Sequence, residues 1–156
     1  IAFDTSGRIV VAGWSPRSTG DTNGDLAIWR VNANGTLDTS FNGVGHATHN
    51  GAAGGNDNEE GRAVVIDSAG RILVVGQSAN AAGNADMVVW RYNADGTLDT
   101  GFAGSGFYVH AAAAGGVAGN DGGRALRIDG AGRIVVAGRS TNSAGNQDLA
   151  IWRIVP

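Results

Sequence analysis

The chain has 156 residues, of which 42% are hydrophobic and 27 are glycine, and its net charge is −3. With this acidic balance and no basic cluster in the sequence, we expect neither a nucleic-acid partner nor an anionic membrane surface, and no apolar run is long enough to span a bilayer. All eleven basic residues are arginine and cysteine is absent, which excludes lysine-dependent catalysis, thiol catalysis and thiolate metal sites.

A segment that begins with Gly-Arg-Ile occurs three times, at residues 7–13, 70–76 and 132–138. The copies are spaced by about 60 residues, and self-similarity at such a fixed period is typical of repeat architectures. Repeated residues are mostly scaffold. The repeat therefore predicts an architecture and leaves the ligand or reaction open.

The central copy contains four short segments with the composition of β-strands. Residues 63–67 and 71–75 are rich in apolar β-branched residues and flank a Ser-Ala-Gly turn, which predicts a hairpin. A polar loop over 77–85 leads to a third strand over 86–93, and residues 107–110 favour a fourth. Four antiparallel strands in each repeat predict the blade of a β-propeller.

The first strand has one strictly apolar face. Val64 and Ile66 of the central copy have large apolar counterparts in the other copies, whereas the position between them changes from Ala2 to Val65 to Arg127. This alternation is typical of a strand that packs on a neighbouring sheet.

The third strand carries a tryptophan at the same place in every copy, at Trp29, Trp90 and Trp152. A tryptophan on a binding face is the alternative interpretation. Periodic placement favours burial between blades, because aromatic side chains contribute large apolar areas to cores.

Residues 25–41 and 86–102 resemble the delta-sixty repeat, whose pattern resembles Asp-x-x-x-x-Arg-x-Asn-x-Asp-Gly-x-Leu-Asp-x-x-Phe. The resemblance covers nearly the whole chain in two full copies and one partial copy, with one departure at Asn34 where the second copy has Asp95. It implies a propeller-like β fold in secreted or surface proteins of bacteria, and it implies no activity.

We therefore predict one all-β, β-propeller-like repeat domain over residues 1–156, built from four-stranded antiparallel blades of about 60 residues, two complete and one partial. The blades would span residues 1–61, 62–123 and 124–156. Propellers close with roughly four to eight blades. We expect completion by further blades of a longer parent chain, or by self-association of this chain.

The loops before the third strand carry Asp and Asn around a glycine turn, and such oxygen ligands suit calcium. The candidate ligands are Asp21, Asn23, Asp25, Asn84, Asp86, Asn146 and Asp148. The first copy resembles the opening of an EF-hand loop, but Leu26 stands at the glycine place and Asn32 at the glutamate place. Because Asp and Asn also cap turns, structural turns are the favoured interpretation and calcium is the alternative.

The remaining polar residues form no catalytic constellation. Glu59 and Glu60 are the only glutamates, and adjacent residues in a glycine-rich loop are expected to be solvated rather than to flank a glycosidic bond. His49 and His110 occupy the same place in two copies and His46 stands alone, which is a weak metal pattern.

Arg62 and Arg124 recur before the first strand of two copies. A repeated arginine is more simply structural than ligand-binding. We expect the pair to bond carboxylates such as those of Asp67 or Asp99.

The favoured hypothesis is a non-enzymatic propeller module for binding or assembly in a secreted or cell-surface bacterial protein, with a glycan or protein ligand and no cofactor other than the calcium candidate. One alternative is a calcium-dependent lectin or adhesin with a shallow site in each blade. The other is a glycan-processing propeller, which would need unique polar residues on loops of different blades.

Overall fold

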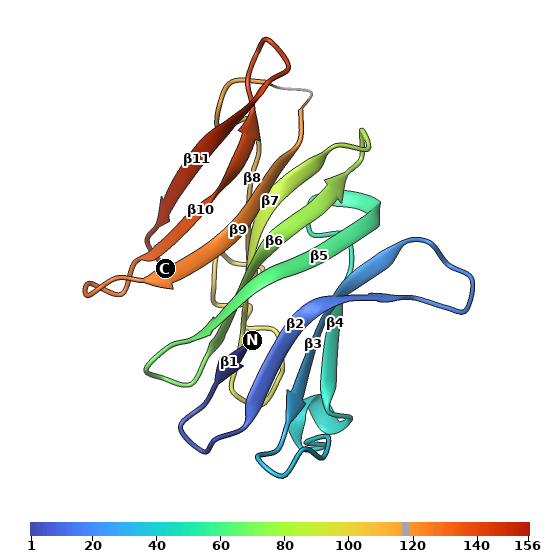
Figure 1. The fold of residues 1–156 in the computed structure, drawn as a ribbon, viewed down its shortest axis with the longest axis vertical. Helices are drawn as coiled ribbons and strands as arrows, with labels where there is room; N and C mark the ends of the chain where they lie inside the picture. Colours follow the sequence, from blue (N-terminus) through green and yellow to red (C-terminus); the bar gives the residue numbers. More distant parts are fainter. Residues whose placement is uncertain (117–118) are drawn as a thin grey trace.

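The computed structural model describes residues 1–116 and 119–156, and these residues form three antiparallel β-sheets (Figure 1). The first sheet has the strand order β1 (Ala2–Phe3), β2 (Ile9–Pro16), β3 (Gly24–Val31), β4 (His46–His49), with a short 3-10 helix η1 (Phe41–Gly43) before β4. The second has the order β5 (Gly54–Ile66), β6 (Ile72–Asn80), β7 (Ala85–Tyr92), β8 (Phe107–His110). The third has the order β11 (Gln147–Ile154), β10 (Ile134–Thr141), β9 (Asp121–Ile128). The prediction of an all-β chain is confirmed.

No helix in the described ranges has the length and apolar character needed to cross a membrane.

The first strand of the second sheet is longer than the sequence pattern indicates. It begins at Gly54, well before the expected start at residue 63, and it runs as a strand through Glu59. A register shift leaves Arg62 as a bulge between paired neighbours, and Arg124 of β9 has the same place in the third sheet. The prediction that Glu59 lies in a solvated loop is therefore wrong, because pairing with β6 buries it completely.

The sheets are joined by two apolar cores. The core between the first and second sheets includes Leu26, Ile28, Val64, Val74, Val88 and Trp90. The core between the second and third sheets includes Leu73, Val75, Met87, Val89, Leu126 and Trp152. Successive residues of a strand point to opposite faces, so neighbours such as Val74 and Val75 enter different cores. The central sheet is therefore apolar on both faces.

The tryptophans of the third strand follow this layering. Trp90 of β7 is fully buried against the first sheet, and Trp152 of β11 is buried against the second. The prediction of packing between sheets is confirmed for these two. Trp29 of β3 is only half-buried, because no sheet in the described part of the chain covers that face.

The Leu-Asp-x-x-Phe segment after the third strand contacts an arginine of that strand. Arg91 Nε donates a hydrogen bond to Asp99 Oδ2 at 2.7 Å, and the guanidinium lies 4.7 Å from the ring centroid of Phe102. The first copy repeats this arrangement with Arg30, Asp38 and Phe41. These contacts hold the Leu-Asp-x-x-Phe segment against the third strand that precedes it, and we call this segment the clip.

The hairpin between the first two strands is held by a second repeated ion pair. Arg71 Nε donates to Asp67 Oδ2 at 2.7 Å, and Asp67 Oδ1 accepts the backbone N–H of Arg71 as well. The same pair recurs as Asp4 with Arg8 and as Asp129 with Arg133. Asp67 and Asp99 therefore bond Arg71 and Arg91, and the expectation that they bond Arg62 or Arg124 is wrong.

Replacing Trp90 by alanine should lower the free energy of unfolding by about 3–5 kcal/mol, the usual cost of deleting a buried tryptophan side chain. Urea denaturation measures this loss. Trp29→Ala is the matched control, because its half-exposed ring has less contact to lose. Equal losses for the two variants would contradict the assignment of Trp90 to the core between the sheets.

Candidate functional site

A polar groove crosses the three sheets at one end of their first and second strands. One hollow of about 260 Å³ is lined by Trp14, Thr22, Asn58, Glu59, Glu60 and Gln77. A second hollow, of about 420 Å³, has Asn58 and Gln77 in its lining as well, together with Asp57, Asn120 and Arg139. The two hollows share these two residues and therefore lie side by side. We call them together the polar groove.

Two further clefts lie at the hairpin ends of the sheets. The larger, about 390 Å³, lies between the second and third sheets and is lined by Asp67, Arg71 and Arg91. Its counterpart between the first and second sheets, about 200 Å³, is lined by the equivalent Asp4, Arg8 and Arg30. Their charged residues are engaged in the repeated ion pairs. These clefts belong to the scaffold.

The polar groove differs from those clefts because one repeated strand position in its lining changes from copy to copy, although Asn58 and Asn120 are equivalent. Trp14, Gln77 and Arg139 occupy the same place in β2, β6 and β10, where their strand partners are Leu26, Met87 and Leu149. Trp14 is 54% exposed at the rim of the groove. None of the sequence patterns described above predicted a role for this position. The available signal was a change from Trp to Gln to Arg inside an otherwise repeated segment.

Arg62 points towards the groove, because it lies in the bulge of β5 and a β-bulge changes the direction of a side chain. Arg62 Nε donates a hydrogen bond to Glu60 Oε2 at 3.0 Å, and Arg62 Nη2 lies 2.9 Å from the same oxygen. Its Nη1 and the Oε1 of Gln77 are buried without a partner among the described residues. Both atoms lie against Gly122, where a Cβ would be 2.8 Å from Arg62 Nη1 and 3.1 Å from Gln77 Oε1. Only glycine fits there without displacing them.

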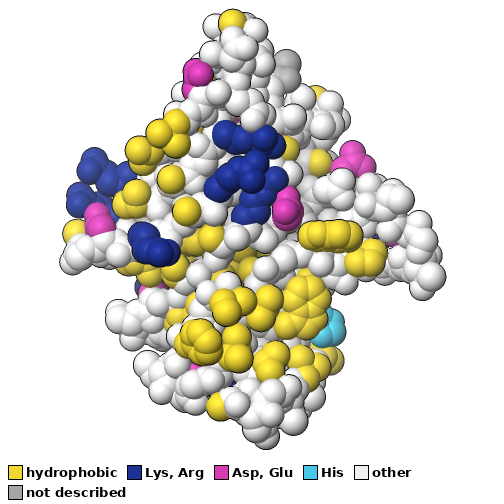
Figure 2. Space-filling view, viewed as in Figure 1, with side chains coloured by type: hydrophobic (Ala, Val, Ile, Leu, Met, Phe, Trp, Pro, Cys, Tyr) yellow, Lys and Arg dark blue, Asp and Glu magenta, His cyan; other side chains and the backbone are white. Residues whose placement is uncertain are grey.

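Positive charge gathers around Arg139. Burial and the neighbouring positive charges of Arg124 and Arg62 lower the pKa of Arg139, and Glu60 opposes that effect. Arg139 Nη1 donates to Gln147 Oε1 at 2.8 Å. Figure 2 shows arginine side chains gathered over the region of β5, β9 and β10, with an acidic side chain beside them. The groove therefore has a locally positive end on an acidic protein.

A buried carboxylate lies beside the groove. Glu59 Oε1 accepts a hydrogen bond from Ser78 Oγ at 2.8 Å, and Oε2 has no partner among the described residues. Burial raises the pKa of Glu59. Asp121 has the same place in β9 and is also buried, with a carboxylate oxygen that accepts the backbone N–H of Ala112. Glu59 and Glu60 bond different partners and do not converge on one point.

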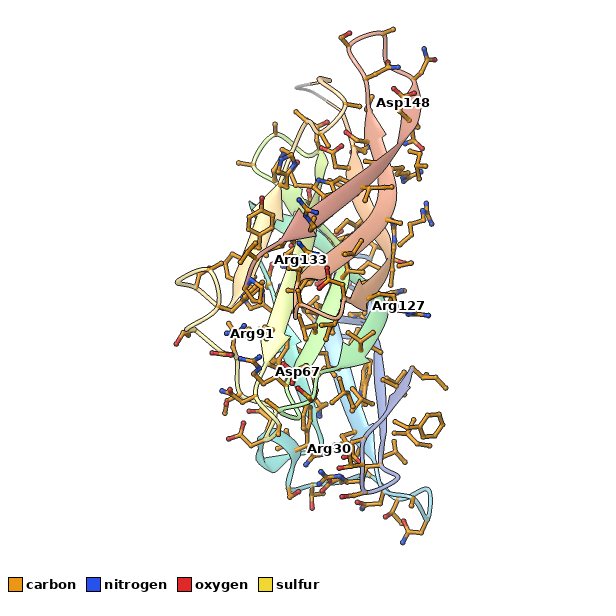
Figure 3. All side chains as sticks on the ribbon, turned by 90° about the vertical axis from the view of Figure 1, so that its left-hand side faces the viewer. Arg30, Asp67, Arg91, Arg127, Arg133 and Asp148 are labelled. Carbon is orange, nitrogen blue, oxygen red and sulfur yellow. The ribbon has the colours of Figure 1, made fainter. Side chains whose placement is uncertain are left out.

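The calcium candidates of the second and third copies lie in separate hairpin loops. Both carboxylate oxygens of Asp86 accept from Asn80 Nδ2 at 3.2 Å, and Asn84 contributes its backbone N–H to the same turn. In the third copy, Asp148 accepts from Asn142 at 3.1 Å and Asn146 donates its backbone N–H to Asn142. Asp148 lies near the tip of the β10–β11 hairpin (Figure 3).

In the first copy an arginine takes the place of the asparagine. Arg17 Nε donates to Asp21 Oδ2 at 3.0 Å and lies 3.9 Å from Asp25 Oδ1. Asn23 donates from Nδ2 to Asp57. Within the described residues, no group of three or more acidic or histidine side chains is placed to hold a metal ion. Calcium binding stays a prediction.

The histidines of the fourth strands pack against aromatic rings. The ring centroids of His49 and Phe107 are 4.9 Å apart, and His49 Nδ1 accepts from Trp90 Nε1 at 3.4 Å. Burial lowers the pKa of His49. The ring centroids of His110 and Trp152, which belong to the second and third sheets, are 6.3 Å apart. These contacts make the repeated histidines part of the packing between sheets.

Comparison with known proteins identifies the family of the repeat. The model of a β-propeller family, described as a domain of unknown function (DUF5122), matches residues 5–41, 70–102 and 132–156. The matched segments include Trp14, Gln77 and Arg139, whereas Glu60, Arg62 and Arg124 fall outside them. No curated protein matches the chain.

Among solved structures, the chain is similar to a fucose lectin from Kordia zhangzhouensis in complex with methyl-fucoside. The two are 15% identical with a TM-score of 0.53, and the similarity covers 96% of this chain and 88% of the lectin chain. At this identity the similarity shows a shared fold.

Glu59 should make the protein less stable as the pH rises. Because burial raises its pKa above the ordinary value of 4.5, the folded chain prefers the protonated form. That stabilisation is complete below the ordinary pKa and is lost as the pH rises through the raised pKa of the folded chain. We expect the melting temperature of Glu59→Gln to depend less on pH than that of the wild type. Glu60→Gln keeps Glu59 and should retain the wild-type slope, so equal slopes in all three proteins would contradict this assignment.

Proposed function

We propose, from the premise that the chain belongs to the DUF5122 β-propeller family, that it is a non-enzymatic binding module of a secreted or cell-surface bacterial protein and that its ligand is a glycan. The observation that carries the proposal is Trp14, more than half exposed at the rim of a groove lined by carboxylate and amide groups.

The chemistry of a sugar matches such a groove. A pyranose ring has faces of C–H groups, which stack on an exposed indole, and an edge of hydroxyl groups, which bond planar polar side chains. Asn58, Glu60 and Gln77 supply amide and carboxylate groups beside Trp14. A concave site with an apolar platform and a few polar groups is the usual form of a small-ligand site.

Binding is favoured over glycan hydrolysis. A glycosidase needs two carboxyl groups that face one glycosidic bond. Glu59 is fully buried and bonded to Ser78, whereas Glu60 is paired with Arg62. Both residues line the same hollow, but Glu59 is withdrawn from solvent and Glu60 is neutralised by Arg62, so they do not form the exposed pair of carboxyl groups that hydrolysis needs.

The similarity to a fucose lectin supports a glycan as the class of ligand through the fold alone. It does not indicate which sugar this chain would bind. In a calcium-dependent lectin, the carboxylates at the start of the third strands would be the calcium ligands. The carboxylates of Asp86 and Asp148 already accept hydrogen bonds from asparagine side chains, which favours a glycan site that does not need calcium.

Trp14→Ala should abolish or weaken glycan binding by at least about tenfold, because it removes the stacking platform. A glycan array followed by calorimetry on the strongest probe measures the change, with and without EDTA. Trp29→Ala is the matched control and should bind as the wild type does. Full binding by Trp14→Ala would contradict the proposal, and loss of binding in EDTA would favour the calcium-dependent alternative.

Among the three sheets that the described residues form, two faces are uncovered, one at each end of the stack. Leu149 and Ile151 of β11 are 79% and 69% exposed, whereas their counterparts in β7, Met87 and Val89, are buried in the second core. At the other end, Phe3 of β1 is also exposed. We propose that a second copy of this chain covers these faces head to tail and so continues the same packing of sheet on sheet.

Light scattering should therefore give a mass of two or more chains at micromolar concentration. Ile151→Glu should reduce the mass to that of one chain, because it places a charge in the proposed interface. Val44→Glu alters an exposed apolar residue in the loop before β4 and should leave the mass unchanged. A wild-type chain that stays monomeric at every concentration would contradict self-association.

A further inference from the structure

Three arginines lie close together beside the polar groove, and one of them, Arg139, lines it. Arg62 and Arg124 are the bulge residues of β5 and β9, and Arg139 of β10 is the strand partner of Gly122. Gly122 is also the residue against which Arg62 Nη1 lies. Arg62 and Arg139 thus flank the same glycine from two sheets, and Arg124 follows two residues later in its strand.

The charges of this arginine cluster are incompletely compensated. Of these three arginines only Arg62 has an ion-pair partner among the described residues, and that partner is Glu60. Arg62 Nη1 and Arg139 Nε have no hydrogen-bond acceptor in the described part of the chain. The other arginines with a carboxylate partner, all engaged with aspartates, are Arg8, Arg17, Arg30, Arg71, Arg91 and Arg133. The cluster therefore differs from the rest of the protein, where an aspartate accompanies most guanidinium groups.

The cluster and the aromatic platform belong to one groove. Gln77 lines the hollow that contains Trp14 and also the hollow that contains Arg139. A ligand that extends over Gln77 would reach both. We propose that the groove selects an acidic glycan, whose sugar ring stacks on Trp14 while its carboxylate or sulfate group is held by Arg124 and Arg139.

This inference rests on the proposed function and names its ligand class. Guanidinium groups match carboxylate and sulfate oxygens with two parallel N–H donors. An anion would also relieve the mutual repulsion of the three arginines. A long polyanion such as a nucleic acid is disfavoured, because the chain has a net charge of −3 and would repel it outside the cluster. An acidic peptide would satisfy the arginines but would leave Trp14 without a sugar ring to stack on.

Calorimetry with matched oligosaccharides tests whether the groove prefers an acidic glycan to a neutral one. The probes are tri-galacturonate, its methyl ester and neutral galactotriose, which share one ring skeleton, together with sulfated galactotriose to separate carboxylate from sulfate. We expect the better acidic probe to bind about tenfold more tightly than the neutral ones, as a charge-assisted pair implies. Arg139→Gln should remove this preference. Arg133→Gln is the matched control, because Arg133 is paired with Asp129 in the β9–β10 hairpin and lines neither hollow of the groove.

The outcomes separate this inference from the proposed function. Equal binding of acidic and neutral probes, lost in Trp14→Ala, would overturn charge selection and keep the glycan site. If poly-glutamate bound as tightly as the acidic oligosaccharide and Trp14→Ala left that binding unchanged, the groove would attract anions in general. That result would also overturn the inference. Failure of every acidic probe overturns it too, and the glycan array then decides whether the proposed function survives. Thermal unfolding of Arg139→Gln confirms that the variant is folded.

Discussion

The packing of one sheet on the next is the constraint on which the rest of the structure depends. Each sheet of this chain is apolar on both faces, so a single sheet cannot bury its hydrophobic residues alone. The central sheet is the only one of the three described that is covered on both sides, through Val74 and Trp90 on one face and Val75 and Met87 on the other. The outer two each leave one apolar face exposed, which accounts for Phe3 and Ile151 at the surface.

This constraint divides the repeated residues from the unique ones. The repeated arginines and aspartates hold hairpins and clips within each sheet, and they set the geometry in which sheets stack. The polar groove forms where first and second strands of successive sheets meet, and there one strand position differs from copy to copy. A stack of near-identical layers can in this way carry a unique site, because Trp14, Gln77 and Arg139 occupy one repeated place with three different chemistries.

The groove also shows how glycine and irregular strands serve a site. A side chain at Gly122 would displace Arg62 and Gln77, and the bulges at Arg62 and Arg124 turn these arginines away from ordinary strand pairing. Local departures from regular β-structure thereby concentrate three guanidinium groups in an acidic chain. The physical result is a positive end of a polar groove, with an aromatic platform at the other end.

The amino-acid sequence alone determined the all-β class, the repeated strands and the burial of Trp90, because period-2 alternation and a fixed repeat are local patterns. It did not reveal that Glu59 is buried, that Arg62 pairs with Glu60, or that Trp14 lies in one groove with Gln77. Those outcomes depend on strand register and on which sheet faces which, since a one-residue bulge changes where every neighbouring side chain points. Only the tertiary structure decided them, because it alone brings residues of three separate sheets to the same place.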